Sequence, residues 1–287
     1  MDDIRTTKFS WARRAAYQSN NTGRVTSIMK AQQFEHFAPT LRSLTPAELG
    51  GAPTLYEKLL LAREGNLDVC YAPFEYINPA ARVVIVGITP GRTQMLNAIK
   101  EARRQLDQGA GSHEALKAAK QTGAFSGAMR PNLISLLDGV GLNRWLGIAS
   151  CDALFTSASH LVQTASVLRN PVFVGGENYN GAPNMTKHPL LQRQLLSQFG
   201  EDIKALPNAV LIPLGDKVAE ALHYLSCKGL LSQDRILDGL PHPSGANAER
   251  IAYFLGKKNR ESLSSKTNPE KLDKAKSLMI SRVLALA

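Results

Sequence analysis

The stretch Ala81-Arg82-Val83-Val84-Ile85-Val86-Gly87 decides the fold class, because it is a short β-branched run that ends in glycine. Runs of this kind are typical of buried parallel strands that are covered on both faces. A segment of helical composition follows at 93–107. The sequence therefore predicts a strand that leads directly into a helix, as in α/β proteins.

Further strand and helix signals continue on both sides of this unit. Strands are predicted at 152–156, 209–213 and 235–240, and helices at 54–65, 131–142, 190–206, 215–225, 246–255 and 269–286. Strands that alternate with helices predict a three-layer αβα sandwich around a central, mainly parallel four-stranded sheet. We expect residues 1–50 to form an N-terminal extension and residues 51–287 to form a single domain.

Composition limits the class of protein. Lys and Arg number 34 against 24 for Asp and Glu, a formal net charge of +10, and such a balance attracts polyanions such as nucleic acids. There is no run of about 18 apolar residues, and the N-terminus lacks the apolar region of a signal peptide, so we expect a cytoplasmic protein without a membrane span. Its cysteines, Cys70, Cys151 and Cys227, are far apart, which argues against a metal site or an iron–sulfur cluster.

Two segments follow predicted strands, at the sheet edge where such folds bind their ligands. The first is Gly87-Ile88-Thr89-Pro90-Gly91, a glycine-containing turn that lets a ligand approach the backbone and the start of the next helix. The second is Pro241-His242-Pro243-Ser244-Gly245-Ala246-Asn247, in which two prolines restrict a histidine and small residues follow it. By itself, each segment is equally compatible with an ordinary turn.

Together, a GxxPG turn on an early strand and HPSGxN after a late strand resemble the paired motifs of the uracil-DNA glycosylase superfamily. The resemblance covers roughly residues 70–260 and is greatest to members whose first motif is of the GxNPG type. It implies a monofunctional DNA glycosylase, which extrudes one base from DNA and hydrolyses its bond to the sugar. It implies DNA as the partner, no cofactor and no metal. No obligate protein partner is evident.

The resemblance also implies roles for individual residues. His242 occupies the position that donates a hydrogen bond to the carbonyl oxygen of the departing base. The turn with Ile88, Thr89 and Gly91 contacts the base and positions the attacking water, and Phe125 stacks on the base. DNA contacts are expected from Arg92, Pro243, Ser244, Gly245, Asn247, Lys257 and Lys258.

Three features depart from the pattern of the superfamily. Thr89 stands where relatives carry Asp or Asn, and a hydroxyl cannot act as a carboxylate base. After the predicted second strand, Thr156 and Ser157 replace the asparagine that reads uracil, and Asn178 or Asn180 of the following loop are candidate substitutes. Gly91 replaces the bulky tyrosine with which uracil-strict members reject groups on the 5-carbon of a pyrimidine.

These departures favour a base with a bulky group on its 5-carbon, such as the glucosylated hydroxymethylcytosine of phage DNA, and hence a role in antiviral defence. Repair of uracil or mismatched thymine is the alternative within the same chemistry. A catalytically silent DNA-binding module is the alternative in another class, because Thr89 lacks a carboxylate. His242 argues against this last possibility, since a protein that merely binds DNA needs no histidine at that position.

Overall fold

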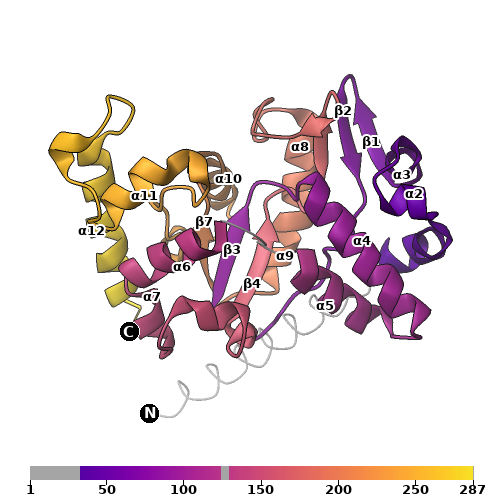
Figure 1. The fold of residues 1–287 in the computed structure, drawn as a ribbon, viewed down its shortest axis with the longest axis horizontal. Coiled ribbons are helices and arrows are strands. Elements are labelled where there is room, and N and C mark those ends of the chain that lie inside the picture. Colours follow the sequence, from indigo (N-terminus) through magenta and orange to yellow (C-terminus); the bar gives the residue numbers. More distant parts are fainter. Residues whose placement is uncertain (1–32, 124–128, 287) are drawn as a thin grey trace, which may run out of the picture.

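The computed structural model describes residues 33–123 and 129–286. A parallel sheet lies at the centre, in the order β4-β3-β7, with β3 at Val83–Gly87, β4 at Val162–Ser166 and β7 at Val210–Pro213 (Figure 1). A single parallel bridge joins Leu211 to Ile236 on the far side of β7. A parallel sheet is thus confirmed, but with three strands instead of four. Its strands β3 and β7 were predicted and β4 was not, whereas the predicted strand at 235–240 is reduced to one bridge.

Helices cover both faces of the parallel sheet. On one face, Val84 and Val86 of β3 pack in a core with α8 (Pro189–Gln194), a π-helix (Leu195–Phe199), α9 (Gly200–Lys204) and α10 (Asp216–Cys227). On the other face, Val83 and Ile85 pack against α6 (Met129–Gly139), α7 (Leu142–Leu146), α11 (Ala248–Phe254) and α12 (Pro269–Leu284). Because side chains alternate along a strand, the uninterrupted apolar run of β3 serves both cores at once.

A second, antiparallel sheet was not predicted. Its order is β1-β2-β5-β6, with β1 at Leu60–Glu64, β2 at Leu67–Cys70, β5 at Val172–Val174 and β6 at Glu177–Asn178. The predicted helix 54–65 is wrong in its second half, since α3 spans only Pro53–Lys58. The consecutive Leu59, Leu60 and Leu61 do not follow a helical period, and Gly65, with a φ of 61°, turns the chain into β2.

The N-terminal helices build a third core on this side of the molecule. A helix over 33–43 and α2 (Pro46–Leu49) pack with α4 (Arg92–Asp107) and α5 (Ser112–Gly123), where Phe34 and Leu41 are fully buried beside Met95 and Ile99. The predicted boundary at residue 50 therefore does not separate two cores. In the described part of the chain, no helix is long and apolar enough to cross a membrane.

The predicted strand 152–156 is wrong, and this changes the position of two predicted site residues. Residues Cys151–Phe155 form a 3-10 helix because Ser150 caps it, accepting a hydrogen bond from the N–H of Asp152. Asp138 supports the cap by accepting bonds from the hydroxyl of Ser150 and the N–H of Cys151, both at 2.7 Å. Short 3-10 helices also occur at Ser159–Leu161, Gln233–Arg235, Gly245–Asn247 and Arg260–Ser262.

Candidate functional site

A cavity of about 120 Å³ lies where β3 and β4 end. Gly87 pairs with Ser166 in the sheet register, so both strands reach the cavity at their carboxyl ends. Its lining includes residues of the turn after β3, the end of β4 and the second motif: Gly87, Ile88, Thr89, Pro90, Thr164, Ala165, Ser166 and His242. The two motifs singled out in the sequence thus border one cavity, which we call the strand-end cavity, at the edge where parallel α/β sheets bind ligands.

The turn after β3 has a fixed backbone. The N–H groups of Val167 and Leu168 donate to the carbonyl oxygens of Gly87 and Ile88, each at 3.0 Å. These bonds extend the pairing of β3 with β4 beyond the end of the strands. A wall of the cavity is therefore preformed by backbone, as a site that positions a flat ligand requires.

Thr89 connects this turn to the antiparallel sheet. Its hydroxyl donates to the carbonyl oxygen of Asn170 at 3.0 Å and accepts from the N–H of Val172 at 3.2 Å. Because the single proton of the hydroxyl is used in this way, Thr89 can offer a water only its remaining lone pair. The geometry gives Thr89 a role in holding the turn, and its role in positioning the attacking water stays a prediction.

The start of α4 is closed by side chains. The N–H of Gly91 donates to Oε1 of Gln94, and the N–H of Arg92 donates to Oδ1 of Asn178, both at 2.9 Å. A Cβ on Gly91 would lie 3.6 Å from Nδ2 of Asn178, so the space beside this glycine is bordered by that amide. Asn178 is therefore the asparagine that contacts the turn. A Cβ on Gly91 would make only ordinary contacts, so the room beside this glycine for a substituent of the base stays a prediction.

Arg92 is held away from the cavity. Its guanidinium donates to the hydroxyl of Tyr56 at 3.1 Å and to the carbonyl oxygen of Gly176. It also lies over the rings of Tyr56 and Phe173, at 5.1 and 5.5 Å from their centroids. These contacts fix the β5–β6 hairpin to the start of α4. Arg92, which was predicted to bind DNA, thus stabilises the fold at this point.

His242 is half-buried, with one ring nitrogen already engaged. The N–H of Ser244 donates to its Nδ1 at 3.2 Å, so Nδ1 is the acceptor and a neutral ring carries its proton on Nε2. Burial lowers the pKa of His242, which favours this neutral form near pH 7. The ring packs against Gly215, which has a φ of 96° and whose Cβ would lie 3.5 Å from Cδ2 of the histidine. The result is an oriented, neutral N–H donor.

The rest of the second motif is anchored at its base and open at its tip. The carbonyl oxygen of Pro243 accepts from Nδ2 of Asn132 on α6 at 2.9 Å, and Nδ2 of Asn247 donates to the hydroxyl of Ser244 at 3.2 Å. Gly245 is exposed, and a Cβ there would meet nothing within 4 Å. Pro243, Ser244 and Asn247 thus hold a loop whose free point is Gly245.

The two lysines after α11 differ in their surroundings. Lys258 forms an ion pair of 2.8 Å with Glu249, whose carboxylate also accepts from the hydroxyls of Ser264 and Thr267. These contacts hold the pKa of Glu249 at about 2, well below its usual range. Lys257 is exposed. Lys258 therefore helps to fix the 256–267 loop, and Lys257 remains the better candidate for a phosphate contact.

Two predicted base-binding residues lie away from the strand-end cavity. Because 152–156 is not a strand, Thr156 and Ser157 do not lie at the sheet edge; Thr156 lines a separate cavity and Ser157 is exposed in a turn. The hydroxyl residues at the sheet edge are instead Thr164 and Ser166, in the carboxyl-terminal half of β4. The weakness of the strand signal in VQTAS, which is short and polar, explains why sequence analysis missed them.

Phe125, the predicted stacking residue, lies outside the described residues. A different aromatic ring, Phe74, lines the cavity and is 5% exposed. It lies close to Gly123, where a Cβ would be only 2.7 Å from Cε1 of the ring. Position 123 must therefore lack a side chain for the ring of Phe74 to pack there, although the two residues are far apart in the sequence.

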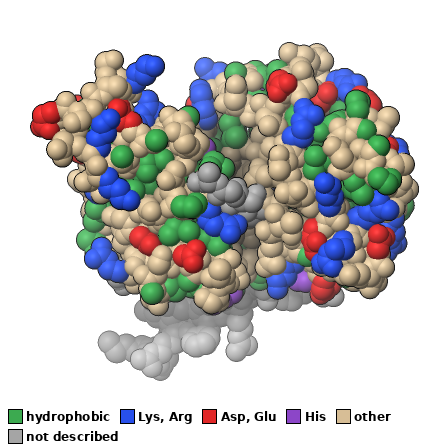
Figure 2. All heavy atoms as spheres, in the orientation of Figure 1, with side chains coloured by type: hydrophobic (Ala, Val, Ile, Leu, Met, Phe, Trp, Pro, Cys, Tyr) green, Lys and Arg blue, Asp and Glu red, His purple; other side chains and the backbone are tan. Residues whose placement is uncertain are grey.

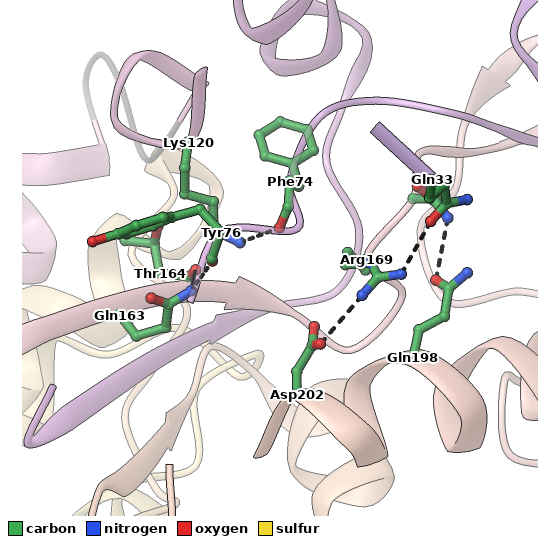
Figure 3. A network of polar contacts seen from close by, with 10 residues as sticks. Gln33, Phe74, Tyr76, Lys120, Gln163, Thr164, Arg169, Gln198 and Asp202 are labelled. Carbon is green, nitrogen blue, oxygen red and sulfur yellow. Dashed lines mark hydrogen bonds and ion pairs between the residues drawn. The ribbon is translucent and has the colours of Figure 1, made fainter. Parts of the chain in front are cut away.

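Charged side chains from two further elements also reach the cavity. The amine of Lys120 donates to the carbonyl oxygen of Phe74 at 2.9 Å, and Arg169 forms a buried ion pair of 3.2 Å with Asp202 (Figure 3). Close to these cations, burial raises the pKa of Glu75 to about 7, and the nearby Arg169 opposes this rise. Sequence analysis missed all of these groups, because only the tertiary fold brings them together.

Comparison with known proteins identifies a family but no activity. The chain is 39% identical over 236 residues to the uncharacterized protein YoxB of Bacillus subtilis strain 168, a match that covers 79% of this chain and 87% of YoxB. No family model matches the chain, and no solved structure matches it. The length and level of this identity show that the chain belongs to the family of YoxB.

Proposed function

We propose that this protein is a monofunctional DNA glycosylase that binds an extruded base in the strand-end cavity. The observation that carries the proposal is His242, a half-buried histidine whose Nδ1 accepts from Ser244 and whose ring lines a cavity of about 120 Å³. That volume equals about four water molecules and is too small for a drug-sized ligand. It suits a single heterocyclic ring, in keeping with the resemblance of the two motifs to the uracil-DNA glycosylase superfamily.

The arrangement fits the electronic demand of the reaction. When the N-glycosidic bond breaks, its electron pair leaves with the base and the sugar becomes oxocarbenium-like. The Nε2–H of neutral His242 then donates to the carbonyl oxygen on which the negative charge develops. A water attacks the anomeric carbon, and the proton that it loses ends on the base anion, which leaves an abasic site and the neutral free base. Loss of one such preorganised donor lowers kcat about 10²–10³-fold.

The end of β4 bears on the substrate class. Thr164, Ala165 and Ser166 line the cavity at the end of β4, and among its described lining residues there is no asparagine. Hydroxyl groups can bond a base edge but lack the paired donor and acceptor of an amide. We therefore favour a 5-modified cytosine of phage DNA, such as glucosylated hydroxymethylcytosine, over uracil or mismatched thymine.

The net charge of +10 and the shape of the molecule are compatible with DNA as the partner. Figure 2 shows a notch between the side that carries α11 and α12 and the side that carries α8 and β1, with Lys and Arg side chains spread over this face. The exposed Gly245 has space for a close approach to DNA. Hydrogen bonds of Pro243 and Asn247 hold the loop on either side of Gly245. The tip of the loop can therefore enter a DNA groove while the rest of the loop keeps its conformation.

The test is abasic-site formation by the purified protein on matched DNAs that contain uracil, thymine opposite guanine, hydroxymethylcytosine or its glucosylated form. We expect cleavage at the modified base and a loss of about 10²–10³-fold in His242→Ala. The matched control is His36→Ala, which removes an exposed histidine from helix 33–43 and leaves the rate unchanged. Full activity of His242→Ala would overturn the assignment of the donor.

A second candidate function is a DNA-binding module without catalysis. It is favoured by Thr89, whose hydroxyl proton is donated to the backbone of Asn170, so that this position does not supply a general base. Under this alternative, no DNA of the panel is cleaved, and His242→Ala binds DNA as tightly as the wild type. Cleavage of any DNA in the panel excludes it.

A further inference from the structure

A second cavity adjoins the strand-end cavity. Its volume is about 420 Å³, and the two cavities share Lys120 and Thr164 in their linings. It extends along β4, the outer strand of the parallel sheet, towards Val162 at the start of that strand. Figure 3 shows Lys120 close to Tyr76 and Thr164. Because Lys120 and Thr164 line both cavities, the two spaces are neighbours in the fold.

The lining of the second cavity is rich in hydrogen-bond donors. Lys117, Lys120, Arg130 and His160 contribute to it, and among its described lining residues there is no Asp or Glu. Arg130 lies over the ring of Phe155, with its guanidinium carbon 4.9 Å from the centroid. A lining of this kind favours a ligand that presents oxygen acceptors.

Two amides of the cavity wall serve the structure. Nδ2 of Asn78 donates to the carbonyl oxygens of His160 and Val162 at 2.8 and 3.0 Å, and its N–H donates to Oε1 of Gln163 at 2.9 Å. Nε2 of Gln163 in turn donates to the carbonyl oxygen of Tyr76 at 3.0 Å. These bonds preform the wall of the second cavity.

The two cavities differ in volume, and therefore in the size of the group that each can hold. The strand-end cavity, at about 120 Å³, lies below the roughly 300–1,000 Å³ of drug-sized ligand pockets, whereas the second cavity, at about 420 Å³, lies within that range. An unmodified base would need only the strand-end cavity. A base with a large polar substituent would need the strand-end cavity and the neighbouring second cavity together.

We propose that the second cavity receives a hexose carried by the extruded base, with Lys117, Lys120 and Arg130 donating to its hydroxyl oxygens. Tyr76 and Phe155 provide apolar surface for the carbon skeleton of the sugar. This inference rests on the proposed function, and it locates the preference for a glucosylated base in a part of the molecule that neither motif touches. The space for the sugar lies along the edge of β4.

The experiment measures how much the sugar contributes to binding. In the cleavage-deficient His242→Ala background, the Kd of one DNA duplex is compared with hydroxymethylcytosine and with its glucosylated form, at fixed salt concentration. We expect the glucose to tighten binding about tenfold or more, as one charge-assisted hydrogen bond would. Adding Ser159→Trp, which fills the cavity from an exposed position, should abolish this gain, and adding Lys117→Ala should reduce it.

Matched controls and a separate readout make each outcome decisive. Ser43→Trp and Lys100→Ala make the same substitutions at exposed positions of helix 33–43 and α4, and each should retain the full gain. A gain that survives Ser159→Trp, or the absence of any gain, overturns the inference. An equal loss for both DNAs also overturns it, since a backbone phosphate would then occupy the cavity.

The proposed function is judged independently, by abasic-site formation with the wild type. If the wild type cleaves DNA but shows no preference for the glucosylated base, the glycosylase proposal is supported and the sugar site is refuted. If binding depends on glucose and this dependence is lost in Ser159→Trp, but no DNA is cleaved, the sugar site is supported and the glycosylase proposal is refuted.

Discussion

Replacing Thr89 by valine tests whether this residue holds the turn after β3. Valine has nearly the same shape but no hydroxyl, so the substitution deletes the bonds to the carbonyl oxygen of Asn170 and the N–H of Val172. Asn170 is 2% exposed and Val172 is 1% exposed, so both backbone groups lose their partner in a buried place. Each unsatisfied buried group costs about 1–3 kcal/mol, so for two groups we expect a loss of about 2–6 kcal/mol in the free energy of unfolding.

The assay is urea denaturation, followed by circular dichroism, with the midpoint and slope compared among variants. Thr89→Ser retains the hydroxyl and should lose much less stability than Thr89→Val. Thr93→Val makes the same replacement at an exposed position of α4 and should stay within about 0.5 kcal/mol of the wild type. A change below about 0.5 kcal/mol in Thr89→Val would refute the reasoning, because the hydroxyl would then be free for another task.

Three further predictions concern the surroundings of the cavity. Asn178→Ala removes the acceptor for the N–H of Arg92 at the start of α4 and should destabilise the protein by about 1 kcal/mol in urea denaturation, whereas an unchanged midpoint would dismiss this cap. Gly123→Ala places a Cβ 2.7 Å from the buried ring of Phe74 and should cost about 1–3 kcal/mol by overpacking; thermal unfolding measures this, and a wild-type Tm would show that the ring yields freely. Burial raises the pKa of Glu75 to about 7, above its ordinary value of 4.5, so the folded state retains a proton that the unfolded state releases, and stability should fall as the pH rises between those values. Glu75→Gln should remove this fall in urea denaturation from pH 4.5 to 7, and identical pH profiles for variant and wild type would contradict the assignment.

The main features of the parallel sheet could be predicted because its strands carry their signal locally. The run Val83–Val86 is buried on both faces, and an uninterrupted β-branched segment has that meaning wherever it occurs. The helix after it was also predicted, because its composition is that of a helix. The strand Val162–Ser166 was missed, since three of its five residues are polar and its pairing partner, β3, is remote in the sequence.

In the candidate site, too, the residues with a local sequence signal could be predicted and those that depend on tertiary contacts could not. The turn at 87–91 and His242 could be found, because each lies in an unusual local pattern of glycine or proline. Phe74 reaches the cavity only because Gly123 permits the approach of the ring, and nothing near either residue in the sequence indicates this contact. The second cavity likewise depends on the placement of α5, α6 and the edge of β4 relative to one another.

The most direct test of the proposed function is the rate of abasic-site formation by the wild type and His242→Ala on DNA that differs only in the target base. The account predicts cleavage by the wild type, with the glucosylated hydroxymethylcytosine preferred, and a rate about 10²–10³-fold lower in the variant. Failure of the wild type to release any base from DNA that it binds would contradict the account and leave a DNA-binding protein in its place.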